Sequence, residues 1–162
     1  MSTAPNRRPP AVSATAPPSS LLLDSQLCFA LYSTSLAMTK LYRPYLVALG
    51  LTYPQYVVLL ALWQRDGLTV SELGARVALD SGTLTPLLKR MQTAKLIQRL
   101  RGTEDERQVH ISLTAKGSAL RSKAAEVHER VVCATACSST ERKTLTHSLQ
   151  RLRASLLANA AS

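Results

Sequence analysis

The sequence predicts a mainly α-helical protein with one small β-hairpin. Along most of the chain, apolar residues recur at intervals of three and four, which places them on one face of a helix. Within residues 96–113 a charged loop is instead followed by a stretch in which apolar residues alternate with polar ones, which is typical of a hairpin. Apolar residues make up 46% of the 162 residues, aromatic residues only 4%, and glycines number six. We therefore expect a core of aliphatic helices rather than a β-sandwich.

Two helices are expected before the hairpin region. The first covers residues 21–49, with Asp24 or Ser25 as its N-cap and with Pro44 as a kink or the start of a new segment. The second runs from about Pro54 to Arg65. Both carry apolar residues at helical spacing, so each needs a surface to pack against.

The middle of the chain has the pattern of a helix-turn-helix. Thr69 and Glu72 form a capping box at the start of a short helix. The turn "ALDSG" leads to a further helix that runs to about Lys95, and two helices joined by a tight turn form a helix-turn-helix. The hairpin follows directly, so its charged loop from Gly102 to Arg107 is expected to be a wing. Residues 67–114 are therefore predicted to be a winged helix-turn-helix.

Two more helices are expected after the wing, split near "CSSTE", where Ser139 or Thr140 caps the last one. The fold class is thus mainly α, an α+β winged helix-turn-helix with about six helices and a two- or three-stranded wing. The apolar surface of the terminal helices favours a homodimer that forms through them. The expected organisation is a disordered tail over 1–20, dimerisation and sensor helices over 21–66, the DNA-binding region over 67–114 and C-terminal dimerisation helices over 115–162.

The charge of the chain favours a polyanion as its partner. Twenty Lys and Arg face ten Asp and Glu, which gives a net charge of +10. From Ser81 to Thr103 there are five basic residues and no acidic one, as a phosphate backbone requires. In the wing, Arg107 is expected to enter a minor groove, with Asp105 as its supporting partner. The candidate DNA-binding residues are Ser81, Thr83, Thr85, Lys89, Arg90, Arg101 and Arg107.

The cysteines and the apolar runs indicate a reducing, cytoplasmic location. Three cysteines are too few for a disulfide scaffold, and no apolar run has the ~20 residues of a membrane span. Cys133 and Cys137 lie four residues apart and are expected on one face of the helix after the wing. With His128 they do not have the spacing of a structural zinc site, so we expect no metal and no cofactor.

Cys28 is the candidate for redox chemistry. It is expected about one turn inside a helix, where the helix dipole modestly favours an anion. Tyr32 lies at i+4 on the same face, and Tyr42 lies fourteen residues on and points in a similar direction. Tyr42 is roughly 21 Å along a straight helix at 1.5 Å per residue, so it could reach a cysteine only in a second subunit or after a sharp fold-back.

The run "SELGARVALDSGTLTPLLKRM", followed by "DERQVHISLTAKG", resembles the MarR family of winged-helix repressors over residues 21–157. Within that family, "LDSGTLTPLLKRM" and "LCFALYS" resemble the organic hydroperoxide resistance regulators. The resemblance implies that Cys28 is the peroxide-sensing thiol and that Tyr42 and Tyr53 surround it from the partner subunit. Tyr32 would be an additional neighbour.

The resemblance also implies a redox switch. Oxidised Cys28 would form an intersubunit disulfide with a resolving cysteine after the wing, for which Cys133 is favoured over Cys137 because it lies deeper in its helix. The disulfide would release double-stranded DNA, a pseudo-palindromic operator, and derepress a peroxide-detoxification gene. A one-cysteine mechanism, which ends in a mixed disulfide with a small thiol, remains open.

Two other functions compete with this interpretation. A thiol peroxidase would share the reactive cysteine, but it has no use for a basic helix and a wing, so the protein is not expected to be an enzyme. A repressor released by a non-covalent phenolic or aromatic ligand would share the DNA-binding region, and Cys28 would then be incidental.

Overall fold

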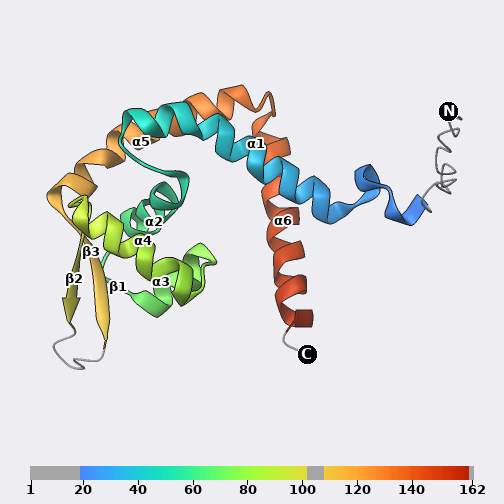
Figure 1. Ribbon diagram of the computed structural model, residues 1–162. Coiled ribbons are helices and arrows are strands. Elements are labelled where there is room, and N and C mark those ends of the chain that lie inside the picture. Colours follow the sequence, from blue (N-terminus) through green and yellow to red (C-terminus); the bar gives the residue numbers. More distant parts are fainter. Residues whose placement is uncertain (1–18, 102–107, 161–162) are drawn as a thin grey trace, which may run out of the picture. The chain divides into compact units, whose positions relative to one another are not determined.

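The computed structural model describes residues 19–101 and 108–160 (Figure 1). The chain divides into two compact units, Met1–Met38 and Thr39–Ser162. The boundary falls within helix α1, Leu27–Ala48. The division of the chain into a tail, sensor helices, a DNA-binding region and C-terminal helices stays a prediction.

The first unit contains two 3-10 turns, Ser19–Leu21 and Leu23–Ser25, followed by the start of α1. The expectation of a helix from residue 21, capped by Asp24 or Ser25, is wrong. The backbone of Gln26 is extended, and its N–H donates to the carbonyl of Leu23 at 3.0 Å, which closes the second turn before α1 begins. Cys28 is therefore the second residue of α1 and lies in its first turn.

The second unit contains the rest of the fold. Helix α1 continues through Pro44 to Ala48 and does not restart there. Pro44 removes one intrahelical donor, but both it and Lys40, whose carbonyl is left without that partner, are exposed to water. The remaining elements are α2 (Tyr53–Gln64), β1 (Leu68–Thr69), α3 (Val70–Val77), α4 (Ser81–Thr93), β2 (Ile97–Arg101), β3 (Val109–Leu113), α5 (Ala115–Ala134) and α6 (Ser139–Ala160).

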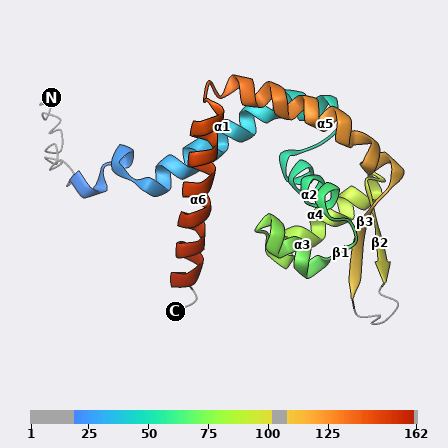
Figure 2. The ribbon, with the colours of Figure 1, turned by 180° about the vertical axis from the view of Figure 1, so that it is seen from behind.

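A small sheet and three short helices form the core. Figures 1 and 2, which view the molecule from opposite sides, both show α2, α3 and α4 gathered beside the three strands. The sheet is antiparallel in the order β1-β3-β2, with five residue pairs between β2 and β3 and two between β1 and β3. The predicted fold class is confirmed. The most deeply buried side chains include Leu59, Leu62, Leu73, Leu84, Leu88, Met91, Ile97 and Ile111.

The helix-turn-helix forms as predicted because its caps satisfy the helix ends. The Thr69 side chain accepts from the N–H of Glu72 at 3.2 Å, and the Glu72 carboxylate accepts from the N–H of Thr69 at 2.8 Å. Asp80 caps α4 by accepting from the N–H of Thr83 at 2.9 Å. Between the helices, a β-carbon at Gly74 would lie 2.9 Å from the carbonyl oxygen of Leu79, so the turn is as tight as a glycine allows.

The start of α5 is joined to the end of α4. Thr114 caps α5, and its hydroxyl donates to the carbonyl of Lys95 at 2.6 Å. The Lys116 ammonium donates to the carbonyl of Ala94, the C-cap of α4, at 2.9 Å. At Gly117, an added β-carbon would lie 2.1 Å from the carbonyl oxygen of Leu96. This close approach fixes the position of α5 against the turn between α4 and β2.

The break between α5 and α6 lies earlier than the sequence suggested. Helix α5 ends at Ala134, and Ala136 adopts a left-handed conformation with φ of 53°. Ser138, rather than Ser139 or Thr140, caps α6: its hydroxyl accepts from the N–H of Glu141 at 3.2 Å, and the Glu141 carboxylate accepts from its N–H at 2.7 Å. Cys137 therefore lies in the loop, and the expectation that it shares a helix face with Cys133 is wrong.

Among the helices of the described residues, none is by itself long and apolar enough to cross a membrane. Helices α1 and α2 pass such a test only as a pair, by length and composition, with a bend of 78° at their break. Helix α2 supplies Val58, Leu59 and Leu62 to the core.

We expect Gly117→Ala to destabilise the fold although Gly117 lies in a helix. Alanine in a helix interior normally stabilises by about 0.5–1 kcal/mol relative to glycine. Here the added carbon meets the Leu96 carbonyl, so the free energy of unfolding should fall by about 2 kcal/mol or more. Chemical denaturation followed by circular dichroism measures the change. The matched control is Ser118→Ala on the exposed neighbouring position, and a Gly117→Ala variant as stable as that control would contradict the packing described.

Candidate functional site

The exposed face of α4 carries the predicted DNA-binding groups. Leu84, Leu87, Leu88 and Met91 are buried, so the opposite face of the helix is turned to solvent. Lys89 and Arg90 are exposed there, as are Ser81 and Thr83 near the N-terminal end, whereas Thr85 is half-buried. The position of these groups on the second helix of a helix-turn-helix is the one from which side chains reach base edges and phosphates in a major groove.

Thr83 has a contact that sequence reasoning missed. Its hydroxyl donates to the carboxylate of Asp80 at 2.8 Å, in addition to the cap formed by its N–H. These two bonds hold the pKa of Asp80 below its usual range, because both favour the ionised carboxylate. Thr83 thus fixes the start of α4, and its oxygen stays available as an acceptor.

The wing is described only where it joins the body. Arg101 is the last residue of β2 and pairs with Val109 of β3. The predicted wing residues Asp105 and Arg107 lie outside the described residues. The five pairs between β2 and β3 confirm the hairpin that the alternating residues predicted.

The three cysteines are free thiols in different settings. Cys28 is exposed in the first turn of α1, and Cys133 is exposed in the last turn of α5. Cys137 is half-buried in the α5–α6 loop. Its thiol donates to the carbonyl oxygen of Thr135, with 3.4 Å between Sγ and that oxygen. Among the residues that the structure describes, no three His, Cys, Asp or Glu side chains are grouped as metal ligands.

Two of the predicted sensor-pocket tyrosines come together, with a third that the sequence analysis missed. The ring centroids of Tyr42 and Tyr53 lie 5.2 Å apart, and that of Tyr56 lies 5.5 Å from Tyr42. Tyr56 is three residues after Tyr53 on α2, so the spacing in "YPQY" was the available signal. Tyr32 belongs to the first unit and is 62% exposed.

The tyrosine cluster keeps its hydroxyl groups neutral. Burial raises the pKa of Tyr42 to about 12, and the neighbouring Tyr56 and Tyr53, together with a hydrogen bond to the Tyr56 hydroxyl, act in the same direction. Burial also raises the pKa of Tyr53 and of Tyr56. All three phenols therefore remain hydrogen-bonding groups without charge near neutral pH.

Comparison with known proteins identifies the family. The family model described as transcriptional regulator SarA/Rot matches residues 40–124, more than half of the chain. The organic hydroperoxide resistance transcriptional regulator of Bacillus subtilis is 54% identical over 105 residues, which are 65% of this chain and 71% of that relative. The chain belongs to the MarR and SarA type of winged-helix transcriptional regulators.

Other relatives of this regulator agree with that assignment. The transcriptional regulator TtmR of Methylorubrum extorquens is 48% identical over 140 residues, which are 86% of this chain and 72% of that relative. The structure of reduced AbfR bound to DNA matches with a TM-score of 0.71 at 32% identity, over 84% of this chain and 93% of that one. Disulfide-formed AbfR matches with a TM-score of 0.59 at 34% identity, over 80% and 91%. A further AbfR structure names Staphylococcus epidermidis as its source. This regulator is therefore a DNA-binding protein of the MarR type.

The raised pKa of Tyr42 predicts a loss of stability in alkali. Folding favours the neutral phenol, so this contribution is fully present below pH 10 and is lost as the pH rises through about 12. We expect Tyr42→Phe to reduce the decline in unfolding free energy over that interval and to lower the amplitude of the late phase of tyrosinate absorbance, to which Tyr53 and Tyr56 also contribute. The control is the exposed Tyr32→Phe, and a late phase of undiminished amplitude in Tyr42→Phe would contradict the assignment.

Proposed function

We propose that this regulator is a homodimeric repressor that releases DNA when an organic hydroperoxide oxidises Cys28. The observation that carries the proposal is the exposed thiol of Cys28 in the first turn of α1, beside the exposed side chain of Leu27 and the half-buried Phe29. Unpaired backbone N–H groups at a helix start favour an anion such as a thiolate. The apolar neighbours suit the organic part of a hydroperoxide better than they suit hydrogen peroxide.

The names of the similar proteins support the same chemistry. The Bacillus subtilis relative is a regulator of organic hydroperoxide resistance by name, and AbfR has been solved both reduced on DNA and with a disulfide formed. The similarity to these two regulators supports a regulator, rather than a thiol peroxidase, as the role of this chain.

The proposed oxidation proceeds in two steps. The Cys28 thiolate attacks the terminal peroxide oxygen, the O–O bond breaks, and the sulfur becomes a sulfenic acid while the departing alkoxide takes a proton from water and leaves as the alcohol. A second thiolate then attacks that sulfur, a disulfide forms, and the S–O bond breaks to release hydroxide, which takes a proton and leaves as water. A dithiol reductant returns both cysteines to thiols.

Cys133 is the better candidate for the second thiol. It is exposed on the last turn of α5, whereas Cys137 is half-buried and its Sγ is directed to the Thr135 carbonyl. Attack on a sulfenic acid needs an accessible thiolate. The partner would be the Cys133 of the other subunit, and the tyrosines Tyr42, Tyr53 and Tyr32 would line the pocket of the sensor thiol.

The homodimer is supported by helices with exposed apolar side chains. Helix α6 has no buried residue, and Leu145, Leu149, Leu156 and Leu157 are each about half exposed or more. The first unit likewise contains no buried residue among those described, although Leu21, Leu22 and Leu23 are exposed. Apolar surface of this extent marks an interface. A symmetric dimer would place one α4 on each half of a pseudo-palindromic operator.

The decisive experiment follows DNA release on oxidation. We expect one equivalent of cumene hydroperoxide to release wild-type protein from a duplex that the reduced protein selects from a random-sequence pool, and dithiothreitol to restore binding. Cys28→Ser should bind the same duplex and stay bound after oxidation. Gel-shift titration at fixed salt measures both affinities.

Two results would contradict this proposal. If Cys28→Ser also releases the duplex on oxidation, the sensor lies elsewhere. If neither protein releases it, Cys28 is not the sensor, and release of the duplex by a phenolic ligand such as salicylate would then favour the non-covalent sensor.

The resolving cysteine is tested by crosslinking. We expect oxidised wild-type protein and Cys137→Ser to migrate as dimers on a non-reducing gel, and Cys133→Ser to migrate as a monomer, because only Cys133 is an exposed thiol after the wing. Cys137→Ser is the matched control. A dimer that persists in Cys133→Ser and disappears in Cys137→Ser would assign the role to Cys137.

The exposed cations of α4 should contribute to binding without sequence preference. Removal of one cation that binds a phosphate lowers the slope of log affinity against log salt by about 0.9. We expect Lys89→Ala and Arg90→Ala each to weaken binding of selected and random duplexes alike and to reduce this slope. The control is Lys123→Ala, an exposed cation on α5, and an unchanged slope in both α4 variants would exclude a role of these cations at the phosphates.

A further inference from the structure

Strand β3 is attached at three points along its length to the segment that connects α2 with α3. At its inner end, the carboxylate of Asp66 accepts from the N–H of Leu113 at 2.9 Å. In the middle, Ile111 pairs with Leu68, and next to it His110 pairs with Thr69. Beyond His110 the described part of the strand pairs only with β2. His110 is therefore the outermost residue of β3 that holds the wing to the body of the protein.

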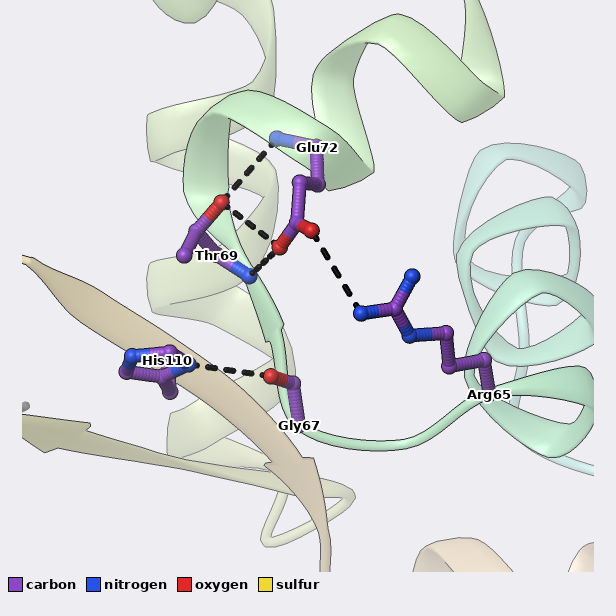
Figure 3. Close-up of polar contacts among 5 residues, drawn as sticks. All are labelled: Arg65, Gly67, Thr69, Glu72 and His110. Carbon is purple, nitrogen blue, oxygen red and sulfur yellow. Dashed lines mark hydrogen bonds and ion pairs between the residues drawn. The ribbon is translucent and has the colours of Figure 1, made fainter.

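The side chain of His110 adds a bond that the sheet does not supply. Its Nδ1 lies 3.0 Å from the carbonyl oxygen of Gly67, which precedes β1 (Figure 3). Gly67 has a φ of +70°, a conformation that side chains other than glycine rarely adopt. The ring nitrogen donates to this carbonyl in the neutral form that carries its proton on Nδ1 and in the cation.

The same place holds the start of the helix-turn-helix. Thr69, the strand partner of His110, is the N-cap of α3, and both its N–H and its hydroxyl donate to the Glu72 carboxylate at 2.8 and 2.9 Å. Arg65 approaches that carboxylate to 3.6 Å. These hydrogen bonds, Arg65 and the nearby His110 hold the pKa of Glu72 below its usual range. Figure 3 shows Arg65 and Gly67 on the α2–β1 connection, Thr69 and Glu72 at the start of α3, and His110 on β3.

We propose that His110 is a positioning residue for DNA recognition, which sets the angle of the wing relative to α3 and α4 through its bond to Gly67. Strand β1 has two residues and two pairs with β3, so the backbone ladder alone resists tilting of the wing weakly. The bond from the His110 ring runs diagonally from the outermost residue of β3 that pairs with β1 to Gly67, which precedes β1, so it braces the short ladder against such tilting. The wing and α4 can engage one DNA segment together only if this angle is held. The role concerns the reduced protein and does not depend on Cys28.

The test compares two replacements of His110 in the full chain. His110→Asn keeps a donor near the place of Nδ1, whereas His110→Leu removes it. We expect His110→Leu to bind the selected duplex at least tenfold more weakly than wild type, while its affinity for a random duplex of the same length and its melting temperature change little. His110→Asn should recover most of the loss. The control is His128→Leu, at an exposed position of α5.

Three outcomes would overturn the proposal. One is a His110→Leu variant that binds the selected duplex as tightly as wild type. Another is a His110→Asn variant as weak as His110→Leu, because the bond to Gly67 would then not matter. The third is a loss that affects both duplexes and the melting temperature together, which would make His110 a residue of general stability.

Discussion

The carbonyl of Leu96 is the point on which the DNA-binding part of the structure depends. It accepts from the N–H of Thr114 at 3.1 Å and from the Thr114 hydroxyl at 3.2 Å. It also occupies the space that a side chain at position 117 would need. Trp63 adds α2 to this junction by donating from Nε1 to the carbonyl of Gly117 at 3.0 Å. The end of α4, the start of β2 and the start of α5 are thus one packed assembly.

This junction connects the site of the proposed disulfide, through α5, to the DNA-binding helix α4. Cys133 lies near the far end of α5, seventeen residues from Lys116, which is about 26 Å along a helix at 1.5 Å per residue. If a disulfide forms at Cys133, its pull acts on a continuous helix whose other end is bonded to the C-cap of α4. A small displacement is enough, because each 1.4 kcal/mol of difference between the two states changes DNA affinity tenfold.

Local signals predicted most of the fold. The capping pair Thr69 and Glu72 and the turn before Ser81 located the helix-turn-helix, and alternating residues located the hairpin. The sequence did not decide whether the sheet has two or three strands, because the two residues of β1 are too few to show an alternating pattern. The start of α1 was placed too early because Leu21 to Leu23 continue the apolar pattern across a turn that Gln26 closes.

The candidate site was less predictable than the fold. Side chains such as Lys89 and Arg90 follow from helix periodicity, but the contacts of His110 and Tyr56 join elements that are distant in sequence. Cys137 was assigned to α5 because four-residue spacing fits a helix, whereas α5 ends at Ala134, before the left-handed Ala136, and the capping bonds of Ser138 and Glu141 start α6.

The central claim, that oxidation of Cys28 releases DNA, is tested most directly by following both events in one sample. Hydroperoxide is added in substoichiometric steps to protein bound to the selected duplex. At each step, fluorescence anisotropy gives the bound fraction, and alkylation with mass spectrometry gives the fraction of each cysteine that is still a thiol. We expect loss of the Cys28 thiol and loss of binding to follow one curve. Release of the duplex while Cys28 remains a thiol, or complete oxidation of Cys28 with the duplex still bound, would contradict it.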